Sequence, residues 1–244
     1  MAPETTDLEQ AAPVIEQAAQ AITGATCVLF DFDGPICGLF AEHRAHDIAE
    51  RLIAWLERED FVVPLTGAER DDPHAVLRVV GASRSPLVHR LEKALTDEEL
   101  RASVTAEPTP HVDRLIRAWS SRGVPLAIAT NNSPLAAESY LTRRDLTSCF
   151  DRHIYGRTRN LDHLKPDPDC LNRALHALDA DPAKSLMIGD TPSDLEAARR
   201  AGVAFLGYAE VGRRTDRLRR AGAETVIHSL EDVLVHVESD GRQA

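Results

Sequence analysis

The sequence of 244 residues is short of basic charge and of long apolar runs. Its 28 lysines and arginines face 39 acidic residues, which gives a net charge of -11 at pH 7. Such a surface repels nucleic acid and anionic membranes, so we expect neither as a partner. No apolar run approaches the roughly 18 residues of a membrane-spanning helix, and the first ten residues carry acids where a signal peptide has basic residues. We therefore expect a cytoplasmic protein that is a monomer or a homodimer.

Cysteine is also scarce, and its spacing fits neither a disulfide framework nor a zinc site. The four cysteines are Cys27, Cys37, Cys149 and Cys170, with no C-x-x-C pair and no cysteine and histidine spacing typical of zinc ligands. We expect reduced thiols that pack in the interior. With 43% hydrophobic residues the chain can bury a sizeable core, and its length fits one core domain with an insertion.

Short apolar runs alternate with helical sequence along most of the chain. Runs of this kind predict buried strands, and the alternation predicts an α/β fold with a mostly parallel sheet and helices on both of its faces. Ligands of such folds bind outside the carboxyl ends of the strands. The predicted strands cover residues 25–30, 124–129, 153–155, 185–188, 203–206 and 225–227.

A long helical segment separates the first two predicted strands. From Leu39 to about Val104 the apolar period is helical, and we expect shorter helices over 74–80, 86–95 and 96–104. The last of these opens with Thr96 and Glu99, which form a capping-box pattern. The predicted division of the chain is an N-terminal extension at 1–24, a core at 25–36 and 120–244, and an inserted, all-helical cap at 37–119.

Four short motifs of polar residues follow predicted strands or lie in the loops after them. Each motif alone is an ordinary turn or helix cap, so it is weak support for a site. Their joint occurrence, each beside a strand, favours a functional site because the carboxyl ends of parallel strands share one edge of the sheet. The candidates are Asp31 and Asp33, Thr130 and Asn131, Lys165, and Asp190 and Asp194.

On these motifs the chain resembles the haloacid dehalogenase-like superfamily of phosphohydrolases. The motifs read DFDGP at 31–35, ATN at 129–131, Lys165-Pro166, and GDTPSD at 189–194. The layout is similar to members with a helical cap between the first two motifs, such as phosphoglycolate phosphatases and β-phosphoglucomutases. The resemblance implies a Rossmann-like three-layer core with an inserted cap, and it covers about residues 25–227.

Four acids in one place need compensation before they can admit a phosphate. One divalent cation and Lys165 would offset three negative charges, and a protonated Asp33 would remove the fourth. A hard cation that binds oxygen ligands and keeps some waters describes Mg²⁺ better than zinc. The predicted metal ligands are Asp31, Asp190, Asp194, the last directly or through water, and the backbone carbonyl of Asp33.

The resemblance also implies a role for each residue. Asp31 would attack phosphorus to form an aspartyl-phosphate, and Asp33 would serve as general acid and then general base. Thr130, Asn131 and Lys165 would bind the phosphate of a small phosphorylated metabolite. An acid at position 33 favours phosphate esters over the substrates of the superfamily's dehalogenases and phosphonatases, which lack it. Pro35 departs from the usual Thr or Val and offers no group to orient Asp33.

Other functions share parts of this pattern. A phosphomutase would share the aspartyl-phosphate but return the phosphoryl group to a sugar phosphate. A signalling receiver domain uses similar residues in another order, so the order and the long insertion of this chain disfavour it. A non-catalytic binding protein of the same fold is the less favoured alternative, because every residue that the chemistry needs is present. Arg84, Ser85 and His89 are candidate substrate contacts in the cap, although charged residues at such positions are often solvated helix residues.

Overall fold

Six parallel strands form the sheet at the centre of the core. The computed structural model describes residues 19–240. The strand order is β3-β2-β1-β4-β5-β6, and the five pairings between neighbouring strands of this sheet are parallel. The predicted α/β fold is confirmed. The strands are β1 (Cys27–Phe30), β2 (Leu126–Ala129), β3 (Ile154–Tyr155), β4 (Ser185–Gly189), β5 (Ala204–Tyr208) and β6 (Val226–Ile227).

Helices cover both faces of this sheet, which makes a three-layer core. Along β1, Val28 and Phe30 point into one apolar cluster and Cys27 and Leu29 into the other, as the two-residue period of a strand requires. The first cluster receives α5 (Val112–Ser121), α6 (Pro134–Arg143), α7 (Thr147–Phe150) and α11 (Leu230–Asp240). The second receives α8 (Asp169–Ala177) and α9 (Pro192–Ala201), while α10 (Arg213–Arg220) packs beside β5 and β6.

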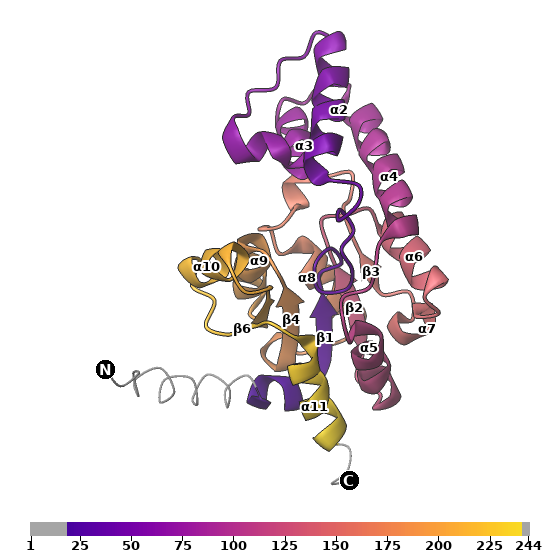
Figure 1. Ribbon diagram of the computed structural model, residues 1–244, viewed down its shortest axis with the longest axis vertical. Helices are drawn as coiled ribbons and strands as arrows, with labels where there is room; N and C mark the ends of the chain where they lie inside the picture. The colour runs from indigo at the N-terminus through magenta and orange to yellow at the C-terminus, as the bar shows by residue number, and fades with distance from the viewer. Residues whose placement is uncertain (1–18, 241–244) are drawn as a thin grey trace, which may run out of the picture.

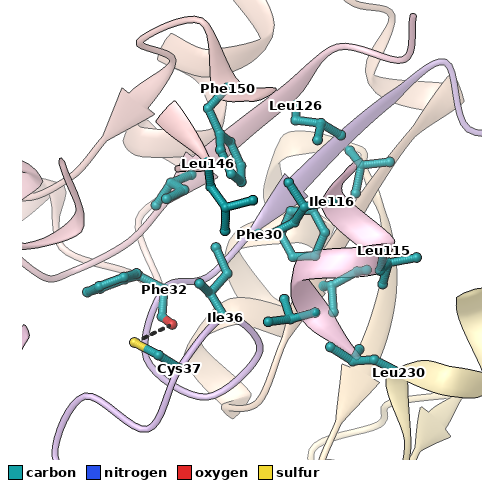
Figure 2. Packing of buried hydrophobic residues seen from close by; sticks show 14 of the residues in the cluster. Phe30, Phe32, Ile36, Cys37, Leu115, Ile116, Leu126, Leu146, Phe150 and Leu230 are labelled. Atoms are coloured by element: carbon teal, nitrogen blue, oxygen red, sulfur yellow. Dashed lines mark hydrogen bonds between the residues drawn. The ribbon is translucent and has the colours of Figure 1, made fainter. Parts of the chain in front are cut away.

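Phe30 lies at the centre of the first cluster. Its ring meets those of Trp119 and Phe150 edge to face, with centroids 5.8 and 6.3 Å apart. Cys37 is buried nearby with its Sγ toward the carbonyl of Phe32 (Figure 2). All four cysteines are free, and only Cys149 is partly exposed. The thiols therefore serve packing, as expected.

The cap lies beyond the carboxyl ends of the strands, toward which the arrows of β1 and β4 point in Figure 1. Its helices α2 (Ala45–Arg58), α3 (Pro73–Ala82) and α4 (Val88–Thr105) share a separate apolar cluster. The 3-10 turn η1 (Gly67–Asp71) precedes α3, and the carboxylate of Asp72 caps α3 by accepting the His74 N–H at 2.8 Å. The insertion thus has a core of its own above the sheet edge.

Helix α4 belongs to both parts of the molecule. Leu91 and Leu95 pack in the cap cluster, whereas Ala102 packs in the cluster under the sheet. The prediction of two helices, the second starting at Thr96, is wrong because α4 runs unbroken from Val88 to Thr105. Glu99 lies in the interior of α4 rather than in its first turn, and it is fully buried.

The predicted division of the chain stays a prediction. Most of the expected extension at 1–24 lies outside the described residues, although Ile22 packs in the cluster of the sheet. Helix α5 was assigned to the cap, yet its Leu115 and Trp119 pack with the sheet, so the cap's own core ends before residue 119. Within residues 19–240 no helix is both long and apolar enough to cross a membrane.

Candidate active site

Lys165 ties together the residues that follow three strands. It comes from the loop after β3, just beyond the turn η2 (Leu161–His163), and its side chain is almost completely buried. Its Nζ lies 3.0 Å from Oδ1 of Asp31 and 2.5 Å from Oδ1 of Asp194, and it donates to the carbonyl of Ala129 at 2.9 Å. Residues far apart in sequence therefore meet at one edge of the sheet, as predicted.

Two glycines allow the acids to approach so closely. Gly34 has a φ of 109°, and a Cβ on it would lie 2.5 Å from Cγ of Asp190. A Cβ on Gly189 would lie 2.6 Å from Cβ of Asp194. Only glycine fits the first position without strain, because it combines a left-handed backbone with this contact. The turn after β1 and the turn after β4 are thus built to touch.

Asp194 is held at the start of α9. Its Oδ2 accepts the backbone N–H groups of Asp190 at 3.2 Å and Thr191 at 2.9 Å, while the Thr191 hydroxyl accepts the N–H of Asp194. This reciprocal pattern is a capping box. Oδ1 of Asp194 faces the Lys165 ammonium as an ion pair and, like Oδ1 of Asp190, accepts no hydrogen bond among the described residues. Asp194 therefore orients the lysine, and its predicted contact with a metal stays a prediction.

The acid cluster fits a divalent cation. Asp31, Asp190 and Asp194 each offer one oxygen, and these oxygens lie within 4.8 Å of one another. Oδ1 of Asp190 is buried and has no hydrogen-bond partner among the residues that the structure describes. Burial and the neighbouring carboxylates of Asp194 and Asp31 raise the pKa of Asp190 well above its usual value. A cation with oxygen ligands, such as Mg²⁺, would satisfy this oxygen and offset the crowded charge.

Asp31 experiences the same crowding. Burial and the Asp194 carboxylate raise its pKa, although the Lys165 ammonium opposes the shift. In contrast, Asp194 and Asp31 keep Lys165 charged: burial alone would lower the pKa of Lys165, but the two carboxylates raise it overall. The lysine is thus a fixed positive charge beside the expected nucleophile.

Asp33 lies beside this cluster but is not one of its three oxygen donors. Burial and the charge of Asp31 raise the pKa of Asp33 to about 6, so it can carry a proton near neutral pH. Its Oδ1 accepts the backbone N–H of Leu39 at 2.8 Å. Leu39 therefore supplies the orienting group that Pro35 lacks.

The loop after β2 is fixed by side-chain hydrogen bonds. Asn131 accepts the backbone N–H of Lys165 at 2.7 Å and donates to its carbonyl at 3.3 Å. The Thr130 hydroxyl donates to Oδ1 of Asn132 at 3.0 Å and accepts the Asn132 N–H at 3.2 Å. The Asn131 amide thus positions the lysine loop in this structure, and its predicted contact with phosphate stays a prediction.

The structure adds residues that the sequence did not assign to the site. Arg78 of α3 donates to the carbonyl of Lys165 at 3.2 Å, and Nη1 of Arg214, in α10, lies 3.4 Å from Oδ2 of Asp190. Glu99 and Arg157 form a buried ion pair beside the loop after β2. These are single charged residues in helices or loops, so the local sequence carries no signal that separates them from exposed ones.

The three cap residues nominated from the sequence are placed at the junction of α3 and α4. The Ser85 hydroxyl accepts the N–H of Leu87 at 3.2 Å. His89 lines a cavity of about 390 Å³ together with Val88, Glu92, Arg159 and Leu161. Arg84 adopts a left-handed backbone with φ 53°. None of these observations joins them to the acid cluster, so their contact with substrate stays a prediction.

Known proteins share this sequence pattern and fold. The family model of haloacid dehalogenase-like hydrolases matches residues 25–202. Phosphoglycolate phosphatase from Aquifex aeolicus is 28% identical over 198 residues, covering 75% of this chain and 86% of that protein. Pyrophosphatase PpaX from Halalkalibacterium halodurans is 27% identical over 217 residues, covering 85% and 94%.

A solved structure supports the same fold. CbbY from Rhodobacter sphaeroides in complex with phosphate superposes with a TM-score of 0.63 at 21% identity, covering 88% of this chain and 99% of that one. The resemblance drawn from the four motifs is confirmed, and so is the prediction of an enzyme. The chain belongs to the haloacid dehalogenase-like hydrolase family.

Proposed function

We propose that the protein is a Mg²⁺-dependent phosphatase of a small phosphorylated metabolite and forms an aspartyl-phosphate on Asp31. The observation that carries this proposal is the meeting of Asp31, Asp190 and Asp194 around Lys165 at the carboxyl edge of the sheet. Phosphoryl transfer needs positioned groups and compensation of negative charge, which this cluster supplies once a cation joins it. When bound, Mg²⁺ would be held by Asp31 and Asp190 and would polarise the phosphoryl oxygens.

The side chains divide the chemistry into two steps. A carboxylate oxygen of Asp31 forms a bond to phosphorus while the bond from phosphorus to the leaving oxygen breaks, and Asp33 gives its proton to that oxygen. A water then attacks the phosphorus, Asp33 takes a proton from it, and the bond to Asp31 breaks to release inorganic phosphate. The raised pKa of Asp33, about 6, suits a group that must both give and accept a proton.

Lys165 and the loop after β2 hold the group being transferred. The Lys165 ammonium, 3.0 Å from Asp31, offsets charge on the nucleophile and on the phosphoryl oxygens. The Thr130 hydroxyl and the amides that follow it would donate to the same oxygens. Asn131 would contribute both by its contact with phosphate and by holding the lysine loop.

The cap would select the leaving group. It lies over the sheet edge that carries the acids, and a lid in that place excludes water and contacts the rest of the substrate. We draw the cap as the segment from Leu39 to about Glu99 and return α5 to the core, because α5 packs with the sheet. Arg84, Ser85 and His89 remain candidates for substrate contacts.

The named relatives support a small phosphorylated substrate. They are named phosphoglycolate phosphatase and pyrophosphatase, and both names denote a small anionic phosphate as the substrate. We therefore propose 2-phosphoglycolate as the first metabolite to test. A cytoplasmic location, the lack of nucleic acid or membrane partners, and a monomeric or homodimeric state stay predictions.

A phosphatase assay tests the proposal. Purified protein should release phosphate from p-nitrophenyl phosphate with Mg²⁺ and should lose that activity with a chelator. Asp31→Asn keeps the size of the side chain but removes the nucleophile, so turnover should fall by at least about 10³-fold. Asp179→Asn changes an exposed turn aspartate and is the matched control.

Each result has a distinct meaning. Activity of Asp31→Asn within tenfold of the unchanged protein would remove Asp31 as the nucleophile. Activity that survives complete metal removal would contradict the role of the cation. A sugar phosphate converted to its isomer without free phosphate would instead establish a phosphomutase.

A further inference from the structure

A buried ion pair joins the cap helix α4 to the loop after β3. The side chains of Glu99 and Arg157 are both fully buried. Nη1 of Arg157 donates to Oε1 of Glu99 and Nη2 donates to Oε2, each at 2.9 Å. Two parallel charge-assisted hydrogen bonds of this kind hold both planar groups in one orientation.

The same pair binds three consecutive residues of the loop after β2. Glu99 accepts the Asn132 side-chain amide at 3.1 Å and the backbone N–H of Ser133 at 3.0 Å. Arg157 donates from Nη1 to the carbonyl of Asn131 at 2.9 Å, and its backbone N–H donates to the carbonyl of Asn132 at 3.0 Å. Both the backbone and a side chain of the loop are therefore bound, by the carboxylate of Glu99 and by the guanidinium and backbone N–H of Arg157.

These contacts continue to the groups that would bind phosphate. With the amide nitrogen of Asn132 on Glu99, its oxygen must face Thr130, whose hydroxyl donates to it at 3.0 Å. The neighbouring Asn131 holds the backbone of Lys165. An altered Glu99 would thus free the Asn132 amide and change the orientation of the Thr130 hydroxyl.

We propose that Glu99, in the cap helix α4, and Arg157, in the loop after β3, are positioning residues that hold the loop 130–133 in its phosphate-binding geometry. The inference rests on the proposed phosphatase function. Burying two charges is costly, and apolar residues often stabilise a core equally well. A positioning role explains why the pair is buried nevertheless. A displacement of about 1 Å in a positioned group can lower the rate about 10²-fold.

Glu92 provides a matched comparison on the same helix. It lies two turns before Glu99 and also pairs with Arg157, at 3.2 Å, but its side chain is 36% exposed. Within the described contacts Glu92 touches Arg157 and Thr96 and not the loop 131–133. Glu92→Gln and Glu99→Gln therefore both remove a carboxylate from Arg157, and only the second removes one from the loop.

The test compares these two variants with the unchanged protein on p-nitrophenyl phosphate and Mg²⁺. Glu99→Gln should lower kcat by at least tenfold and weaken inhibition by inorganic phosphate, while thermal unfolding shows a folded protein. Its amides at 131–133 should exchange hydrogen faster. Glu92→Gln should keep kcat and phosphate inhibition within twofold. A purely stabilising pair would shift the unfolding temperature and leave kcat unchanged.

The possible failures are distinguishable. If the unchanged protein releases no phosphate from any substrate, the proposed function is wrong. If it is active and folded Glu99→Gln keeps its kcat within twofold, or Glu92→Gln loses as much, the positioning role is wrong. Should Glu99→Gln fail to fold, Asn132→Ala, which breaks the link from Glu99 to Thr130, should show the same loss of kcat. Unchanged kcat in that variant would equally overturn the role.

Discussion

Two clusters of buried charge within residues 19–240 differ in how far their charges are compensated. At the sheet edge, Asp31, Asp33 and Asp190 all have a raised pKa, because they are buried and because neighbouring carboxylates outnumber the single ammonium of Lys165. In the other cluster, the pKa of Glu99 is lowered to about 2 although burial alone would raise it, because Arg157 neutralises it. The same residue types thus produce shifts of opposite sign.

The difference supports the proposed cation at the sheet edge. Both carboxylate oxygens of Glu99 accept hydrogen bonds, from Arg157, Asn132 or Ser133. Oδ1 of Asp190 has no such donor among the described residues. Excess negative charge in a buried cluster lowers the stability of the folded protein, and a bound cation would restore it. A buried cluster that is neutral and fully hydrogen-bonded instead fixes the positions of the residues around it. Each cluster can therefore be tested by changing its charge balance.

The largest effect on folding is expected from breaking the satisfied cluster. Arg157→Met would leave Glu99 buried without its cation, so the free energy of unfolding should fall by about 3–5 kcal/mol. Urea unfolding would measure it. Arg200→Met removes a half-exposed arginine that pairs with Glu196 within one helix and should cost about 1 kcal/mol or less. If both variants lost the same free energy of unfolding, the buried pair would be no more important to stability than an exposed one.

The second largest effect is expected when Mg²⁺ binds to the acid cluster. Mg²⁺ at 100 times its Kd should stabilise the protein by about 2.7 kcal/mol, since a ligand bound only by the folded state adds to its stability. Asp190→Asn should lose this response. In chelator the same variant should be about 1 kcal/mol more stable than the unchanged protein, because it has one fewer crowded carboxylate. Thermal unfolding with and without Mg²⁺ would measure both, and an undiminished response to Mg²⁺ in the variant would exclude Asp190 as a ligand.

The third effect is the pH dependence of the pair itself. The pKa of Glu99 is about 2 when folded and near 4.5 in an ordinary environment, so the unfolded chain takes up the proton first. Its contribution to stability is present above pH 4.5 and is lost as the pH falls toward 2, by at most about 1.4 kcal/mol per pH unit. The arginine of the pair stays charged, and His74 lies on the same carboxylate at 3.3 Å. Urea unfolding of Glu99→Gln should therefore approach that of the unchanged protein on acidification, and a constant gap would refute this.

The smallest effect concerns Arg214. Its guanidinium is 71% exposed and lies 3.4 Å from Asp190, where it competes weakly with a cation. Arg214→Gln should lower the Mg²⁺ concentration for half-maximal activity about two- to threefold, and added salt should erase the difference because exposed pairs are screened. A higher Mg²⁺ requirement in the variant would show that Arg214 assists the site.

Much of the fold and the meeting point of the site could be predicted from the sequence. Buried parallel strands are short apolar runs, and polar residues directly after β1, β2 and β4 must share one edge of the sheet. Asp31, Thr130 and Asp190 were found in this way. Their mutual placement follows from topology, which the alternation of strands and helices determines.

The buried pair could not be predicted, for a physical reason. Thr96 and Glu99 match the spacing of a capping box, although Leu91, Leu95 and Ala102 continue one helical face across it. Arg157 and its neighbour Arg159 look alike in sequence, and the partner of Arg157 is 58 residues away. Burial of a charge depends on such distant partners, and local patterns do not report them.

The continuity of α4 bears on how such enzymes can be recombined. This helix begins in the cap and ends in the core, where it packs in the same apolar cluster as the sheet. The orientation of the cap relative to the core therefore depends on one continuous helix. A chimaera joined in the middle of α4 would separate Glu99 from the loop that it binds. An exchanged cap should instead carry α4 through to Thr105 and bring a matching arginine at position 157.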